Sequence, residues 1–205
     1  HVLEDPTMMT KTIDLTIVSI TYNNAGIHNT IDSVLPILND GGKMVIQNGG
    51  RTLKVNHKGI IVHNEKDQGI YDALNKGINK VKTRFFMLLH AGDTFIGSVD
   101  EIKTILFKLE KSQKFMSLNS QYIGTRLHSS YKWRPWMLYL GVQPPHLPCI
   151  YRSEVFVSKK YSIDIPIIAD FDFFYRNIAW KNAQWDNKLL VKMETGGVTS
   201  GGIQS

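Results

Sequence analysis

The sequence has a single cysteine, no long apolar run and no block of like charge, and each shortage excludes a class of protein. Cys149 has no second cysteine to pair with, so an internal disulfide is excluded and the composition fits a reducing compartment. No apolar run approaches the roughly 20 residues that a membrane-spanning helix needs, and no signal peptide opens the chain. We therefore predict a cytoplasmic protein without a transmembrane segment, either free or peripheral to the inner membrane face.

Length and composition favour one folded domain. The 205 residues can bury a substantial core, and 42% apolar with 20% charged residues is ordinary for a soluble globular protein. Residues 1–8 resemble the remnant of a purification tag, and we expect the native chain to begin near Met8 or Met9. Residues 9–205 are then predicted to form a single domain.

The formal net charge of +6 has two interpretations. It can reflect a solvated basic surface together with a positive field that helps to hold a diphosphate. It can also indicate a polyanionic partner, such as nucleic acid or an anionic membrane face. The lysines are spread along the chain rather than grouped, which favours the first interpretation.

Residues 61–94 predict a strand, a polar turn, a helix and a second strand that ends near an acidic residue. Residues 61–63 are apolar, and residues 70–80 place apolar side chains at the spacing of a helix with one buried face. Residues 85–89 are apolar throughout, as in a strand covered on both faces, and Asp93 follows on a tight turn. Open α/β sheets bind ligands beyond the carboxyl ends of their parallel strands, so we predict a ligand site here.

Strands and helices also alternate elsewhere in the chain. The sequence predicts strands at 14–21, 43–46 and 115–123, and amphipathic helices at 27–38 and 99–111. This alternation is typical of an α/β fold with a mainly parallel central sheet flanked by helices.

Residues 65–77, EKDQGIYDALNKG, and residues 89–93, LHAGD, closely resemble a pattern of known proteins. The pattern is EPDxGIYDAMNKG followed by LNAGD, and it belongs to the nucleotide-sugar-dependent glycosyltransferases of family 2. Over a dozen near-matching residues in order make this a specific signal. The resemblance runs from about residue 15 to residue 200, with further matches in TYNN at 21–24, PPH at 144–146, AD at 169–170 and GGVTS at 196–200.

The resemblance implies a single Rossmann-like GT-A domain that transfers a sugar from a nucleoside-diphosphate sugar to an acceptor hydroxyl, with inversion at the anomeric carbon. Asn48 stands where the family usually has an aspartate that binds the base or ribose, and Leu53 takes a second acidic position, so the donor nucleotide stays open. By resemblance, the residues that bind the nucleotide sugar are Thr21, Tyr22, Asn23, Asn48, Gly49, Asp67, Gly69, Tyr71, Asn75, Ala91, Gly92 and Arg152.

For several of these residues the sequence equally allows a purely structural role in place of nucleotide binding. Asn23 and Asp67 could each cap the helix that follows them. Tyr71 and Asn75 share a helical face that either meets solvent or lines the pocket. Arg152 could contact phosphate or form a surface salt bridge.

Asp93 is the main candidate for a metal ligand. Such transferases use a divalent cation to neutralise the departing diphosphate, and a hard cation prefers carboxylate oxygen. By resemblance we expect Mn²⁺ or Mg²⁺, with His90 and His146 as further candidate ligands, because Mn²⁺ accepts mixed oxygen and nitrogen ligands. His90 could instead be a packing histidine, and Asp93 could cap the next turn.

Asp170 is the candidate general base that takes the proton from the acceptor hydroxyl. A carboxylate among apolar neighbours suits this role, because burial makes it a better proton acceptor. Asp170 could also be the N-cap of a helix that begins there. Asp172, two residues on, would point elsewhere on that helix.

Residues 131–140, YKWRPWMLYL, interleave aromatic and basic side chains, and in the family this variable region belongs to the acceptor side. The rings could stack on sugars, lie in a membrane interface, stack on extruded bases or simply pack in a loop. The family's default acceptor is a bacterial surface glycan on a lipid carrier at the inner membrane face. Two alternatives stay open: a bacteriophage-type transferase that glycosylates hydroxymethylated bases in DNA, and a non-catalytic sugar-nucleotide-binding protein.

Overall fold

The computed structural model describes residues 12–112, 115–123, 134–144, 146–147, 149–157, 160–165, 168–177 and 183–194. The predicted tag remnant at 1–8, the start of the aromatic and basic segment at 131–133, and the glycine-rich segment at 196–200 lie outside the described residues.

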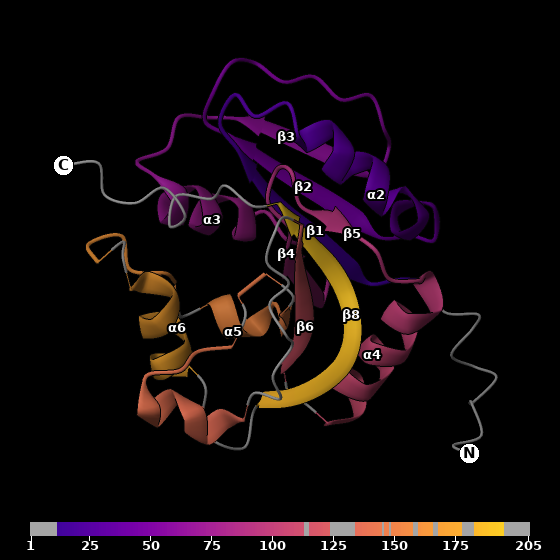
Figure 1. Ribbon diagram of the computed structural model, residues 1–205. Helices are drawn as coiled ribbons and strands as arrows, with labels where there is room; N and C mark the ends of the chain where they lie inside the picture. Colours follow the sequence, from indigo (N-terminus) through magenta and orange to yellow (C-terminus); the bar gives the residue numbers. More distant parts are fainter. Residues whose placement is uncertain are drawn as a thin grey trace.

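One mixed sheet forms the centre of the fold, with the strand order β3-β2-β1-β4-β7-β6-β8-β5 (Figure 1). Strands β3, β2, β1 and β4 are parallel to their neighbours, and β7 then runs antiparallel to both β4 and β6. The prediction of a mainly parallel α/β sheet is confirmed. The strands are β1 (Leu15–Thr21), β2 (Lys43–Asn48), β3 (Ile60–Asn64), β4 (Phe85–Leu88), β5 (Thr94–Phe95), β6 (Phe115–Ile123), β7 (Ile150–Arg152) and β8 (Ala183–Glu194).

Helices cover both faces of this sheet. Figure 1 shows α2 and α4 on one side and α3, α5 and α6 on the other. The helices are α2 (Ile27–Asn39), α3 (Ile70–Ile78), α4 (Val99–Ser112), α5 (Glu154–Val157) and α6 (Ala169–Asn177), and a 3₁₀ helix, η1, spans Pro135–Leu140. Within the described residues, no helix has both the length and the apolar character needed to cross a membrane.

Two hydrophobic cores result, one on each face, and β4 contributes to both. Phe85 and Met87 pack into the core beneath α2 and α4, whereas Phe86 and Leu88 pack into the core beneath α3 and α6. Successive side chains of a strand point to opposite faces, so a strand covered on both sides must be apolar at every position. This explains the unbroken apolar run that the sequence shows here.

The parallel strands end together at one edge of the sheet. Thr21 at the end of β1 pairs with Asn48 at the end of β2, and Asn48 pairs with Asn64 at the end of β3. Beyond β4, the Ala91 amide still donates to the Ile20 carbonyl, at 3.3 Å. The predicted site residues that follow these strands are thereby collected along one edge.

Candidate active site

The loops after β1 and β2 are held by amide side chains. Asn48 is buried; its Nδ2 donates to the Arg51 carbonyl at 2.6 Å and to Asn64 Oδ1 at 2.7 Å, and its Oδ1 accepts from the Gly50 amide at 3.1 Å. Asn23 accepts the Arg51 amide at 2.8 Å. The prediction that the Asn48 side chain contacts the nucleotide is therefore not supported, because its amide group is engaged in shaping the loop.

Thr21 and Tyr22 stand at the end of β1 and differ in exposure. The Thr21 hydroxyl is buried, with no hydrogen-bond partner among the described residues. The Tyr22 side chain is exposed. The main chain is tied to the next strand, because the Gly49 amide donates to the Thr21 carbonyl at 3.1 Å.

Asp67 bridges the loop after β2 and the start of α3. Its Oδ1 accepts the Gly69 amide at 3.1 Å, and its Oδ2 lies so close to Gly49 that a Cβ there would be 2.1 Å away. Gly69, with φ of 125°, is itself the N-cap of α3 and lacks a side-chain cap bond. Asp67 therefore shapes the turn before the helix rather than capping it, and it stays at the predicted nucleotide edge.

Asn75 and Tyr71 of α3 face the segment that contains Tyr161. Asn75 Nδ2 donates to the Tyr161 carbonyl at 2.9 Å, and its Oδ1 accepts the Tyr161 amide at 3.0 Å. The Tyr71 ring packs on the Tyr161 ring, with centroids 5.5 Å apart. Both ends of the Asn75 amide therefore clamp a backbone segment, and nucleotide binding by Asn75 stays a prediction.

Asp170 lies beside three ring-bearing side chains. His146 Nδ1 is 3.9 Å from Asp170 Oδ1, and the Tyr161 hydroxyl is 3.4 Å from His146 Nε2. Burial, followed by the nearby Asp170 carboxylate, raises the pKa of Tyr71, so its hydroxyl stays protonated and can donate. Asp170 Oδ1 is buried, with no hydrogen-bond partner among the described residues.

Asp170 is the second residue of α6, so the N-cap alternative does not hold. The adjacent Asp172 points away from this group, as predicted, and its carboxylate binds Arg176 Nε at 2.8–2.9 Å. Burial lowers the pKa of His146, and the Asp170 carboxylate opposes that effect. The imidazole is consequently neutral near pH 7.

The turn after β4 is built on Thr30, a residue that the sequence did not single out. The buried Thr30 hydroxyl donates to the Asp93 carbonyl at 2.7 Å and accepts the Gly92 amide at 3.0 Å. Asp93 is only 6% exposed, and its Oδ1 accepts the backbone N–H of Glu194 at 2.9 Å. Burial is the main reason that its pKa rises to about 6; backbone hydrogen bonds with Glu194 and His90 oppose the rise, and the charge of Glu194 adds a smaller increase.

Glu194, at the end of β8, is a second acid that sequence reasoning missed. Its carboxylate lies against Gly92, where an added Cβ would be 2.1 Å from Oε2, and Gly92 has φ of 104°. A non-glycine residue at this position would be strained by the left-handed backbone, and the Glu194 carboxylate would have to move aside. The available signal was an acidic residue two positions before a glycine pair, next to the segment matched by GGVTS.

The three predicted metal ligands do not form one cluster. No group of three or more histidine, cysteine and acidic side chains suited to a metal occurs within the described ranges. The His90 ring faces His146, with centroids 6.4 Å apart, while Asp93 is bonded to Glu194. Burial, and then His146, lower the pKa of His90 to about 3, so its imidazole is neutral near pH 7. Its Nδ1 is buried without a hydrogen-bond partner among the described residues, and its role as a metal ligand stays a prediction.

Arg152 lies away from the other residues that were predicted to bind the nucleotide sugar. Arg152 pairs with Phe85 at the amino end of β4, at the opposite edge of the sheet from Asp93. Its guanidinium donates to the Leu109 carbonyl at 2.5 Å and lies over the Phe85 ring, 5.4 Å from the centroid. The side chain therefore fastens α4 to the sheet.

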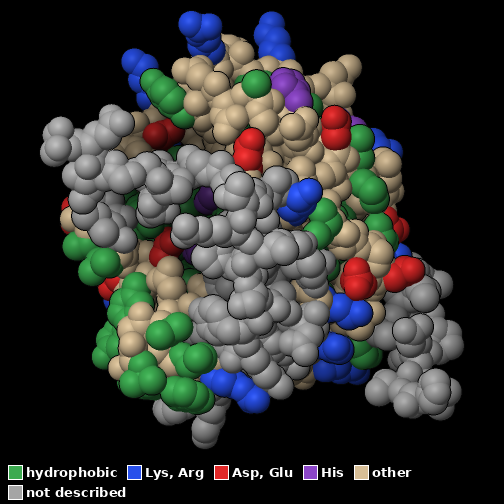
Figure 2. Space-filling model, in the orientation of Figure 1, with side chains coloured by type: hydrophobic (Ala, Val, Ile, Leu, Met, Phe, Trp, Pro, Cys, Tyr) green, Lys and Arg blue, Asp and Glu red, His purple; other side chains and the backbone are tan. Residues whose placement is uncertain are grey.

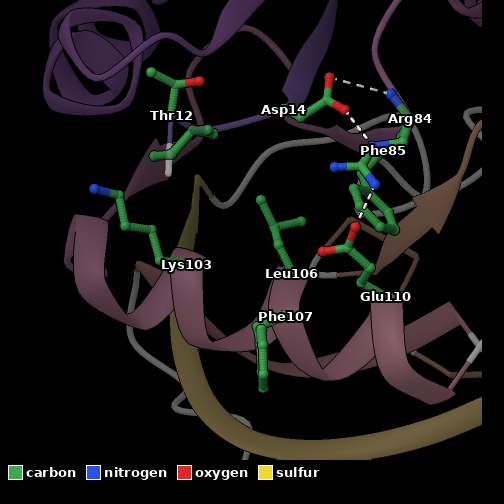
Figure 3. Close-up of a pocket in the computed structure, with 9 residues that line it drawn as sticks. Thr12, Asp14, Arg84, Phe85, Lys103, Leu106, Phe107 and Glu110 are labelled. Carbon is green, nitrogen blue, oxygen red and sulfur yellow. Dashed lines mark hydrogen bonds and ion pairs between the residues drawn. The ribbon is translucent and has the colours of Figure 1, made fainter. Parts of the chain in front are cut away.

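Figure 3 shows a pocket at this same amino-terminal edge. Arg84 crosses it and pairs with Asp14, at 2.6 Å, and with Glu110. Leu106 and Phe107 of α4 add apolar lining. Lys103, also in the lining, pairs with Asp40 at 2.7 Å. The pocket is separate from the site at the carboxyl ends of the strands.

Solved structures share this arrangement of strands and helices. TarS residues 1–349 from S. aureus match with a TM-score of 0.70 at 12% identity, over 89% of this chain and 60% of that one. The chain has the GT-A fold. TarS 1–349 in complex with UDP-GlcNAc gives a TM-score of 0.70 at 10% identity, over 90% of the GT-A chain described here and 59% of TarS.

A third GT-A neighbour comes from another organism. The mannosyltransferase PcManGT from Pyrobaculum calidifontis, in complex with GDP-Man and Mn²⁺, gives a TM-score of 0.65 at 13% identity, over 93% of this chain and 59% of that one. This GT-A chain thus spans about 60% of the length of the first TarS structure. No protein-family model and no curated protein matches the sequence.

Proposed function

We propose that the protein is an inverting glycosyltransferase that moves a sugar from a nucleoside-diphosphate sugar to an acceptor hydroxyl. One observation carries the proposal: the site of this GT-A fold holds two separate acids. Asp93 is buried in the turn after β4, and Asp170, on α6, lies beside the neutral His146. A carboxylate for a metal and a separate carboxylate for proton transfer are the two groups that this reaction needs.

Asp170 is the proposed general base. It lies in the first turn of α6, where the amino-terminal end of a helix favours the anionic carboxylate. Its Oδ1 is free of hydrogen bonds within the described residues and can accept the proton of an attacking hydroxyl. His146 and Tyr71 lie beside it and restrict its orientation.

Asp93 and Glu194 fit a divalent cation. They offer carboxylate oxygens, the ligand type that Mn²⁺ and Mg²⁺ take, and no described cationic side chain forms an ion pair with Asp93. A bound cation supplies charge to stabilise the departing diphosphate. Diphosphate oxygens and water would supply the remaining ligands of such a cation.

The nucleotide is proposed to lie along the ends of β1, β2 and β3. Thr21 contributes a buried hydroxyl and Asp67 a carboxylate. Gly49 and Gly69 lie in the same loops and, as glycines, add no side chain there. Tyr22, Ala91 and Gly92 border the same edge. We retain the sequence-based proposals of a bacterial surface glycan as acceptor and a cytoplasmic location.

A thermal-shift panel tests the donor half of this proposal. Nucleoside diphosphates and nucleotide sugars are each added with Mn²⁺ or with EDTA, because a ligand of the native state raises the melting temperature. A rise that one nucleotide gives only with Mn²⁺ supports the proposal. No rise with any nucleotide would contradict it and favour a protein that kept the fold without the chemistry.

A further inference from the structure

Eight of the large hydrophobic side chains that the described residues expose belong to two neighbouring stretches, residues 136–142 and 163–175. Figure 2 shows hydrophobic side chains gathered at the lower left, where Figure 1 draws η1 and α6. We call this group the outer apolar surface. It consists of Trp136, Tyr139, Leu140, Val142, Ile163, Ile165, Ile168 and Tyr175.

Each segment of the outer apolar surface is anchored in the same core. Leu138 anchors η1, Tyr161 anchors the segment before Ile163, and Phe174 anchors α6, and all three are buried in the core beneath α3 and α6. Because the anchors share one core, the segments lie side by side. The exposed residues are therefore presented by fixed elements.

The surface projects from the fold. Leu140 and Tyr139 are 70% and 64% exposed, and they end η1 just before Gly141, whose φ of 76° turns the chain back. Contiguous apolar patches of this kind mark interaction sites rather than ordinary solvent-exposed surface.

We propose that the outer apolar surface docks the protein on a lipid bilayer that contains anionic phospholipid. Five of its eight side chains are aliphatic, and aliphatic groups do not stack on sugar rings or bases, so a hydrocarbon partner fits better than a glycan or nucleic acid. Trp136, Tyr139 and Tyr175 are the amphipathic aromatic residues favoured at a bilayer interface.

Charge at the border supports a bilayer partner. Arg134 at the start of η1 and Lys160 before Ile163 are exposed and can reach lipid phosphates while their stems lie on apolar atoms. Residues 134–142 contain no acidic residue. Of the nearby acids, Asp172 is paired with Arg176, which leaves Asp164 as the exposed acid of this surface.

Co-sedimentation with vesicles tests the inference on the full chain, without nucleotide, so its outcome is independent of the proposed transfer reaction. The vesicles are phosphatidylcholine alone or phosphatidylcholine with phosphatidylglycerol. The test variant is Leu140→Ser with Ile163→Ser. The matched control, Ile61→Ser with Ile96→Ser, removes two exposed isoleucines from other parts of the surface.

We expect the chain to sediment with the anionic vesicles and more weakly with the neutral ones. Leu140→Ser/Ile163→Ser should lower the partition coefficient about tenfold, since two side chains lose their apolar contact, and the control should change it less than about twofold. Equal circular dichroism spectra confirm that both variants fold.

Any of four results would overturn the inference in whole or in its charge component. The chain could remain in the supernatant with every vesicle, or the control could lower binding as much as the test variant. Alternatively, sedimentation equilibrium could show a dimer that Leu140→Ser/Ile163→Ser converts to monomer without any vesicle binding, which would make the surface a contact between copies. Equal binding to both vesicle types would remove the role given to Arg134 and Lys160.

Discussion

Glu194 donates its backbone N–H to Oδ1 of Asp93 at 2.9 Å, although 101 positions separate the two residues. The end of β8 is thereby fixed against the turn that follows β4. The Glu194 side chain lies over Gly92, so the carboxylates of Asp93 and Glu194 are close together although they come from distant parts of the chain. No described cationic side chain pairs with Asp93.

Asp93→Asn should stabilise the metal-free protein, and more so at higher pH. Burial raises the folded pKa of Asp93 from 3.8 to about 6, so stability is lost as pH rises from about 4 through 6. In EDTA, the advantage of the variant should grow by about 2 kcal/mol between pH 4.5 and 7.5, as urea unfolding measures. Exposed Asp32→Asn serves as the control, and a pH-independent difference for Asp93→Asn would contradict the burial argument.

Asp170→Asn should remove sugar transfer while leaving donor binding intact. The amide cannot accept the acceptor's proton, so we expect a loss of roughly 10²–10⁴-fold in turnover. The nucleotide thermal shift should persist, because Asp170 lies on the α6 side of the site. Asp172→Asn, which breaks only the pair with Arg176, is the matched control; equal losses in both variants would exclude a specific role for Asp170.

Thr30→Val should loosen the turn that carries Asp93. The substitution keeps the shape but removes bonds to the Asp93 carbonyl and the Gly92 amide, at a cost of about 1–3 kcal/mol. The Mn²⁺-dependent thermal shift should also shrink. Thr104→Val removes a comparable bond, to the Asp100 carbonyl at 2.8 Å on the exposed side of α4, and should leave that shift unchanged.

Asn75→Ala should destabilise the protein by about 2–3 kcal/mol in urea, because two hydrogen bonds to the Tyr161 backbone are lost together. Transfer should also fall, since Tyr161 contacts His146 beside the proposed base. Exposed Asn79→Ala, at the end of α3, should stay within about 0.5 kcal/mol of the unmodified protein. Wild-type stability in Asn75→Ala would show that the clamp contributes little.

Most elements were predictable because their patterns are local. The strands at 14–21 and 85–89 and the helices at 27–38 and 99–111 were found within two residues of their observed ends. The predicted helix 70–80 ends at Ile78, and the predicted strand 43–46 continues to Asn48. In the latter case the polar residues Gln47 and Asn48 hid the end of the strand, although both are buried and bonded.

The roles of individual polar residues were less predictable. Asn48, Asn75 and Arg152 had been expected to meet the nucleotide, yet each bonds to protein backbone. A motif shows that a polar group occupies a position but does not show what its hydrogen bonds satisfy. Asn75 is the clearest case, because its partner, Tyr161, is 86 residues away.

By itself the sequence determined the alternation of strands and helices, and hence the collection of polar residues at one edge of a parallel sheet. It also made Asp93 and Asp170 the candidate acids, through their places beside apolar segments and the family resemblance. Only the tertiary structure decided that Glu194 joins Asp93, that His90 turns toward His146, and that Arg152 lies at the far edge. The physical reason is that hydrogen bonding and burial depend on neighbours that the folded sheet brings together from distant positions in the chain.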